Sequence, residues 1–222
     1  VGPITFPDSG LEDMVRVALN LPTGEITGAQ LETLTVFDAQ AKNISDLTGI
    51  ECFTHLTSLD LAGNSLVDIS RLSALESLET LVLTINAIND LSPLASLTHL
   101  KHLDLSQNAV TTLDELSGLT GLLTLNLTTN LIDTLDPLQS LTSLQALDLG
   151  DNAITDFSPL AVLTTLPTLE LYGNGITDIA PIAAMVGLND LDLSDNPFSN
   201  ITPLGNNPGL GVGDFVDITN IG

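Results

Sequence analysis

The chain has 222 residues, 43% of them hydrophobic, and its mean hydropathy of +0.36 indicates a folded protein with a continuous core. Four Lys and Arg against 28 Asp and Glu give a formal net charge of −24, which disfavours nucleic acid and anionic membranes as partners. No apolar stretch is long enough for a membrane span, no signal peptide is recognisable, and the single cysteine, Cys52, excludes an internal disulfide framework.

Residues 1–33 are predicted to form a helical segment at the N-terminus. The pair Ser9 and Glu12 has the spacing of a capping box that begins a helix. The residues that follow carry the apolar stripe of an amphipathic helix: Leu11, Met14, Val15, Ala18 and Leu19. Thr27 and Gln30 repeat the capping spacing, so we expect a second helical turn there.

A repeat of 22 residues begins at Leu34 and continues to residue 209. The eight unit starts are Leu34, Leu56, Leu78, Leu100, Leu122, Leu144, Leu166 and Leu188. In the unit from Leu100, apolar residues occupy positions 1, 4, 6, 11, 14, 17 and 20. Positions 4 and 6 alternate as in a short strand, and every unit runs in the same sense. The repeat therefore predicts an α/β fold, a right-handed solenoid with a parallel concave sheet and short 3-10 or extended arcs on its convex side.

Position 9 predicts a ladder of buried amides along the solenoid. It is asparagine in seven of the eight units: Asn64, Asn86, Asn108, Asn130, Asn152, Asn174 and Asn196. An amide can donate to and accept from backbone groups where the chain leaves the strand. Lys42 occupies this position in the first unit and cannot accept, so we expect the first rung to differ. The return arm often carries proline, as at Pro93 and Pro159, which argues for a short helical turn.

Residues 210–222 form a degenerate last repeat. Counted in steps of 22, Gly213 and Phe215 fall at the strand positions 4 and 6, Asp214 falls at position 5, and Ile218 stands where asparagine is expected. We interpret this segment as a closing strand or as the start of a following domain.

The pattern LxxLxLxxNxIxDxxPLxxLxx, repeated from Leu34, resembles the 22-residue leucine-rich repeats of bacterial internalins. The resemblance implies that residues 1–33 form the helical cap that closes the first turn, without which leucines and strand edges would be exposed. It also implies a secreted or surface-displayed bacterial protein that binds another protein. We expect it to be a monomer.

The concave surface is where a partner is expected. Since side chains alternate along a strand, positions 3, 5 and 7 line this surface, and position 5 is mostly acidic: Asp38, Asp60, Val82, Asp104, Asn126, Asp148, Glu170 and Asp192. The acids become denser toward the C-terminal half, around the only tyrosine. The predicted partner-binding residues are Asp104, Asn126, Asp148, Asp151, Glu170, Tyr172, Asp190, Asp192 and Asp195. The alternative is that the acids are only the soluble face of a soluble repeat.

The sequence offers little for catalysis or metal binding. It contains no GxSxG, HExxH, CxxC, P-loop or GxGxxG pattern, so we expect no enzyme and no cofactor. His102 is expected to be a surface histidine. Calcium is the one metal considered, since Asp190 to Asp195 supplies carboxylates, but no calcium-binding loop is present and no specific metal site is predicted.

Two functions remain open. The first is a protein-binding or adhesion module of a secreted or surface-displayed bacterial protein, which holds a partner with a basic surface on its acidic concave sheet. The second is a structural spacer or stalk of a larger extracellular protein, whose charge serves solubility in a salty medium. The sequence does not name the partner.

Overall fold

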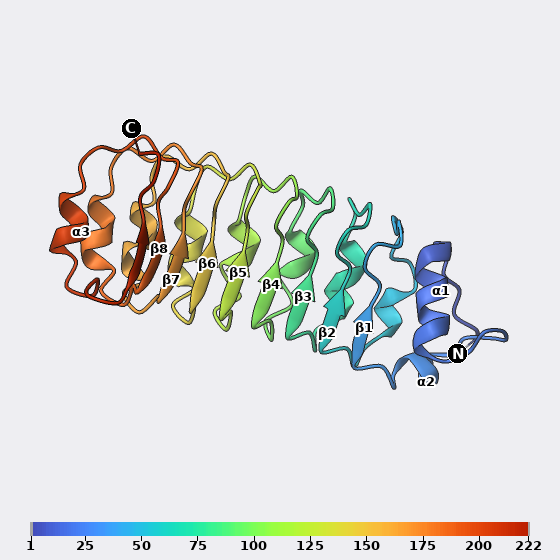
Figure 1. Cartoon of the computed structure of the whole chain (residues 1–222). Coiled ribbons are helices and arrows are strands. Elements are labelled where there is room, and N and C mark those ends of the chain that lie inside the picture. The colour runs from blue at the N-terminus through green and yellow to red at the C-terminus, as the bar shows by residue number, and fades with distance from the viewer. Residues whose placement is uncertain (1, 222) are drawn as a thin grey trace.

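A computed structural model describes residues 2–221 and shows one solenoid with a single open sheet of nine parallel strands (Figure 1). Val1 and Gly222, the outermost residues of the predicted cap and of the last repeat, lie outside the described residues. The strands follow one another in chain order: β1 Val36–Asp38, β2 Ser58–Asp60, β3 Thr80–Val82, β4 His102–Asp104, β5 Thr124–Asn126, β6 Ala146–Asp148, β7 Thr168–Glu170, β8 Asp190–Asp192 and β9 Phe215–Asp217. The predicted solenoid with its parallel sheet is confirmed.

The strands pair in a strict register from β1 to β8. Each residue lies opposite the one 22 positions further on, so that Leu103 of β4 pairs with Leu125 of β5. Identical unit positions therefore stack in straight rows across the sheet, which keeps one side-chain type above another.

The last step of the register is longer than the repeat predicts. Leu191 of β8 pairs with Val216 of β9, and Asp192 pairs with Asp217, a step of 25 residues. The prediction that Asp214 continues position 5 is therefore wrong, and Phe215 stands at the exposed position 3 instead of in the core.

The three added residues lie after the last outer arc, between Asn207 and Phe215. That arc contains helix α3 Thr202–Asn206, followed by the buried Asn207. The amide of Asn207 donates to the carbonyls of Ile182 and Met185, and its oxygen accepts from the backbone N–H of Gly209. These contacts keep the 22-residue register as far as Asn207, and the longer loop begins with the Gly209 N–H on its side-chain oxygen.

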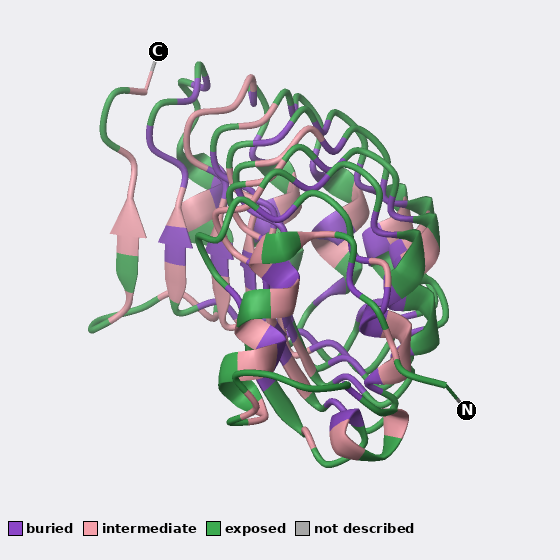
Figure 2. Cartoon of the chain, turned by 90° about the vertical axis from the view of Figure 1, so that its right-hand side faces the viewer, coloured by how far each residue is buried: buried purple, intermediate pink, exposed green. Residues whose placement is uncertain are grey.

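The core lies between the sheet and the outer arcs and is filled by aliphatic side chains. In the unit from Leu100 the seven predicted core positions are all buried, and Figure 2 shows the buried residues gathered inside the coil. The outer arcs are short 3-10 helices: η1 Ile50–Cys52, η2 Ser70–Ala74, η3 Ser92–Leu94, η4 Asp114–Leu116, η5 Asp136–Ser140, η6 Ser158–Val162 and η7 Ala180–Ala184. Pro93 and Pro159 stand at the start of their helices, where a missing N–H costs nothing.

The hydrogen bonds of the asparagine ladder are confirmed, although only Asn130 and Asn196 are buried and the other rungs are partly exposed. The Asn130 amide nitrogen donates to the carbonyls of Leu105, Leu127 and Thr128 at 3.0, 3.0 and 3.3 Å. Its oxygen accepts from the backbone N–H of Val110 at 3.0 Å. One side chain thus joins two neighbouring turns, and the pattern recurs at the other rungs. The first rung differs as expected, because Lys42 supplies only its backbone N–H to the Asn64 oxygen.

The N-terminal end is covered by two helices, α1 Ser9–Ala18 and α2 Gly28–Leu31. Helix α1 begins one residue earlier than predicted, because its N-cap is Asp8, whose carboxylate accepts from the backbone N–H of Leu11 at 3.1 Å. The Ser9–Glu12 capping box is therefore wrong. The second cap is confirmed, since the Gln30 side chain accepts from the Thr27 backbone N–H at 2.8 Å.

Asp8 also joins the cap to the first turn. The second oxygen of its carboxylate accepts from the backbone N–H groups of Ser45 and Asp46 at 2.8 and 3.3 Å. Partial burial acts to raise the pKa of Asp8, but these backbone hydrogen bonds and those from Leu11 and Gly10 outweigh it and lower the pKa below its ordinary value. Between residues 2 and 221, no helix has the length and apolarity needed to cross a membrane.

Unit position 8, just after each strand, has a left-handed backbone in every turn. The nine residues there all have φ between 52° and 65°: Ala41, Gly63, Ile85, Gln107, Thr129, Asp151, Gly173, Asp195 and Asn220. Only glycine adopts this conformation freely, and β-branched residues such as Ile85 and Thr129 are unfavourable in it. The sharp corner that turns the chain away from the sheet is thus imposed by the fold rather than by the residue type.

Candidate functional site

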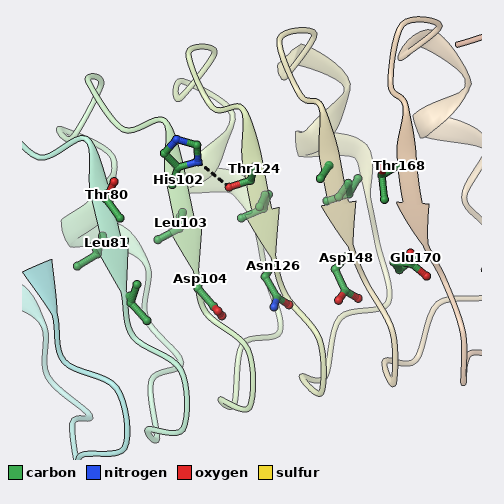
Figure 3. Close-up of a pocket in the computed structure, with 14 residues that line it drawn as sticks. Thr80, Leu81, His102, Leu103, Asp104, Thr124, Asn126, Asp148, Thr168 and Glu170 are labelled. Carbon is green, nitrogen blue, oxygen red and sulfur yellow. Dashed lines mark hydrogen bonds between the residues drawn. The ribbon is translucent and has the colours of Figure 1, made fainter. Parts of the chain in front are cut away.

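The exposed face of the sheet carries two rows of side chains that run across the strands. The position-5 row contains Asp38, Asp60, Val82, Asp104, Asn126, Asp148, Glu170, Asp192 and Asp217. The position-3 row contains smaller or neutral residues over the middle strands: Thr80, His102, Thr124, Ala146 and Thr168. Figure 3 shows Asp104, Asn126, Asp148 and Glu170 projecting in one line from successive strands. The strict register makes both rows continuous.

A hollow of about 320 Å³ lies between these two rows over strands β3 to β7. Its lining includes the core leucines Leu81, Leu103, Leu125 and Leu147 together with members of both rows. The side chains of these leucines are buried in the core, so the floor of the hollow is the strand backbone at position 4, and the small threonine and alanine side chains at position 3 leave that floor open. The open face of the sheet is therefore a shallow groove with an acidic rim, which we call the concave groove.

The acids on the last four strands form one electrostatic cluster. Partial burial is the largest effect on Glu170, and the neighbouring charges of Asp192, Asp190, Asp148 and Asp217 add to it, so that its pKa rises to about 7. The ordinary pKa of a glutamate side chain is 4.5. At neutral pH this cluster therefore holds charge that repels itself and favours a bound cation or a bound basic group.

Neutralising Glu170 is expected to stabilise the protein at high pH only. Because the folded-state pKa of Glu170 is raised, ionising this side chain destabilises the folded protein. This loss of stability is absent below about pH 4.5, grows as the pH rises, and is complete above about pH 7. Glu170→Gln should therefore raise the free energy of unfolding by on the order of 1–2 kcal/mol at pH 8, after allowance for solvent screening, and by little at pH 4.5. Urea unfolding at both pH values measures this. Glu76→Gln, an exposed change away from the cluster, serves as the control, and an equal gain for both variants would contradict the explanation.

Tyr172 stands at position 7 of its unit, two residues after the end of β7, and does not project freely. Its ring lies across Gly150 in the preceding turn, so closely that a Cβ at residue 150 would overlap the ring. The side chain is half-buried, and this burial, with the charges of Asp148 and Asp151, raises its pKa. Tyr172 therefore offers one face of a fixed ring, which costs little conformational entropy on binding.

The predicted site residues separate into three places. Asp148, Glu170, Asp190 and Asp192 belong to the acid cluster, and Asp104 and Asn126 line the concave groove. Asp151 and Asp195 stand at position 8, at the left-handed corner after the strand, rather than on the sheet face. The sequence analysis missed Asp217, because the last register step differs, and missed the groove itself, which depends on side-chain volumes.

Positive charge is confined to the N-terminal part of the chain. Residues 1–101 contain 13 of the 28 Asp and Glu and all four Lys and Arg, whereas residues 102–222 contain the other 15 acids and no Lys or Arg. Lys101 pairs with Glu79 at 2.8 Å, and Arg71 pairs with Glu51 at 3.4 Å. The acid cluster therefore lies in the half of the molecule that has no lysine or arginine to offset it.

The remaining candidates for chemistry are dispersed. Within residues 2–221 no group of three or more His, Cys, Asp or Glu side chains is arranged to hold a metal ion. His102 is exposed, and its ring nitrogen Nδ1 is hydrogen-bonded to the Thr124 hydroxyl at 2.9 Å (Figure 3). Burial raises the pKa of the Cys52 thiol, and the charge of Glu51 adds to this rise, which makes the thiol less reactive.

Comparison with known proteins agrees with this geometry. A family model for "Leucine Rich repeats (2 copies)" matches residues 54–96 and 98–140, and a "Leucine Rich repeat" model matches residues 140–156. No curated protein gives a significant match.

Solved structures give much longer matches. Internalin C2 from Listeria monocytogenes is 32% identical, with a TM-score of 0.92, over 99% of both chains. The Leptospira interrogans leucine-rich-repeat protein LIC12759 is 28% identical, with a TM-score of 0.80, over 87% of this chain and 51% of that one. The ectodomain of the Arabidopsis thaliana receptor kinase GASSHO1/SCHENGEN3, solved with CASPARIAN STRIP INTEGRITY FACTOR 2, is 25% identical, with a TM-score of 0.69, over 80% of this chain and 23% of that one. The chain belongs to the internalin-like leucine-rich-repeat proteins.

Proposed function

We propose that this protein is a binding module that holds a protein partner with a basic surface on its concave sheet. The observation that carries the proposal is the acid cluster on β6 to β9 beside an open groove, on a sheet face whose side chains do no core work. Solenoids commonly bind on their extended concave surface. Complementary charge speeds the encounter with a partner, while contacts with the concave groove and with the Tyr172 ring slow its dissociation.

The proposal includes the setting in which the module acts. A monomeric, secreted or surface-displayed bacterial protein fits the likeness to internalin C2. A protein of the same fold, the GASSHO1/SCHENGEN3 ectodomain, is solved in complex with CASPARIAN STRIP INTEGRITY FACTOR 2. Adhesion through the concave sheet is the activity that we assign to the chain.

The test begins with partners selected from a displayed library of protein domains. Domains enriched on the wild-type chain are expected to be basic, and their binding kinetics can be measured at low and high salt. The combined change Asp190→Asn, Asp192→Asn and Asp195→Asn should lower the association rate by about 3–10-fold at low salt and flatten its salt dependence. Tyr172→Ala should mainly raise the dissociation rate, and Tyr172→Phe, which keeps the ring on Gly150, should not.

A matched triple variant distinguishes the loss of the concave acids from a general loss of negative charge. The changes Asp114→Asn, Asp133→Asn and Asp136→Asn remove the same three charges from exposed positions in the outer arcs. If both triple variants weaken binding equally, or if selected domains protect the outer arcs, the concave site is wrong.

The second candidate is a spacer whose charge serves solubility. The scarcity of Lys and Arg over the whole chain favours it, since the acids then need no partner. A spacer predicts that neither triple variant changes any binding rate.

A further inference from the structure

The concave groove is not uniform along its length. Inside the groove the position-5 row starts with an apolar residue, Val82 on β3, continues through Asp104 and Asn126, and ends with Asp148 and Glu170, while Asp60 on β2 precedes Val82 outside the groove. Beyond β7 the row becomes wholly acidic, with Asp192 and Asp217, and Asp190 adds a carboxylate at position 3. The density of acids is therefore lowest around Val82 and Asn126 and highest toward β8, so the β8 end favours cations and the β3 end is the one that tolerates an apolar group.

The middle of the groove offers a hydrogen-bond donor. The Asn126 oxygen accepts from the backbone N–H and the hydroxyl of Thr128, at 3.0 and 2.7 Å. This bonding fixes the amide so that its NH₂ group projects from a row otherwise occupied by carboxylates and Val82 (Figure 3). A peptide carbonyl is the acceptor that such a donor fits, whereas a purely cationic ligand gains nothing from it.

The dimensions of the groove suit a single extended segment. Five strands at the usual spacing of about 4.8 Å span about 19 Å, the length of about six extended residues. A volume of about 320 Å³ takes a few side chains and not a folded domain.

We propose that the concave groove binds one extended peptide segment of a partner, lying across the strands with small apolar side chains toward Val82 and Lys or Arg toward Glu170 and β8. The proposal rests on the proposed function and adds the form and the direction of the bound segment. Val82, Thr80 and Thr124 contact the small side chains near β3 to β5. Asn126 donates to the peptide backbone, and the acid cluster neutralises the basic end. The partner is thereby recognised by the positive charge at one end of its extended peptide segment.

The direction can be read by photo-crosslinking to the full chain. One synthetic hexapeptide has two arginines at one end, alternating serine and valine, and p-benzoylphenylalanine at the apolar end. A second has the same composition with the crosslinker beside the arginines. The first is expected to label β3 and β4, and the second to label β7 and β8, as mapped by mass spectrometry. Labelling of the same residues by both peptides, or no binding at millimolar peptide, overturns the proposal.

Substitutions at the two ends sharpen the test. Val82→Asp places a carboxylate at the apolar end, so each peptide should then label both ends of the groove. Val67→Asp makes the same change at an exposed position outside the groove and should leave both labelling patterns unchanged. The pair Asp190→Asn and Asp192→Asn should weaken peptide binding about fivefold or more at low salt.

The outcome is separable from that of the proposed function. Selected domains that bind the Asp190, Asp192 and Asp195 triple variant more weakly, combined with peptides that show no direction, would leave the proposed function standing and remove the groove proposal. Selected domains that bind this triple variant as well as they bind the wild-type chain would remove the proposed function itself.

Discussion

Removal of residues 1–33 is expected to leave the chain unfolded or aggregated. The cap covers the first turn: Phe6 packs edge-on against Phe53 with ring centroids 6.2 Å apart, and Phe53 is fully buried. Leu11 and Val15 of α1 and Leu31 of α2 have no exposed surface. Without them the buried side chains of the first turn would face water, and Ser45 and Asp46 would lose their bonds to Asp8. Circular dichroism and light scattering of the truncated chain measure the result.

A single substitution isolates the packing from the deletion. Val15→Asp buries a carboxylate with no partner, so we expect a loss of about 3–5 kcal/mol in the free energy of unfolding. Val17→Asp makes the same change in the same helix, where the side chain is 70% exposed, and should stay within about 0.5 kcal/mol of wild type. Equal melting of the two variants would show that α1 does not seal the core.

Replacing Asn130 with alanine is expected to lower the free energy of unfolding by about 1–3 kcal/mol. The change removes three donated bonds and one accepted bond. It leaves the buried N–H of Val110 without a partner among residues 2–221, while the carbonyls of Leu105 and Leu127 each keep one bond, from Asn108 and Asn152. Because the side chain joins adjacent turns, the loss should also reduce the cooperativity of unfolding. Thermal and urea melts measure both effects.

Asn189→Ala is the matched control for the ladder. Asn189 is exposed, and within residues 2–221 its side chain makes no hydrogen bond, so its removal should be nearly neutral. A melt of the Asn130 variant that coincides with that of the Asn189 variant would remove the ladder as a source of stability.

The regular part of the fold could be predicted because its signals repeat. Leucines at fixed spacing identify the core, the asparagine at position 9 identifies the corner, and prolines such as Pro93 identify the outer arc. An unusual residue in one unit does not mislead the prediction, because the neighbouring units show the expected residue at the same position. The last register step had no such correction, since Asn207 and the residues around it occur once. The helix start was misplaced because Asp8 and Ser9 are both good N-caps and sequence alone does not rank them.

The site could be predicted in outline but not in its parts. Alternation placed Asp148, Glu170 and Asp192 on one face, and the register brought them into one row. The groove depends on how little Ala146 and its neighbours cover, and the raised pKa of Glu170 depends on burial, which spacing does not give. The left-handed corner was hidden by Ile85 and Thr129, although Gly63 and Gly173 at the same position carried the signal.

The uneven placement of Lys and Arg makes the elongated molecule a dipole along its axis. The two chain ends lie at opposite ends of the solenoid (Figure 1), and the half after Lys101 bears the larger excess of negative charge. In the field of a charged surface such a rod turns before it makes contact. An anionic surface repels the β9 end and leaves the capped N-terminal end nearer, while a basic surface meets the acid cluster first. The charge gradient thus sets the orientation of the solenoid as it approaches a charged surface. The first contacts are then made by the few strands at the end that faces the surface.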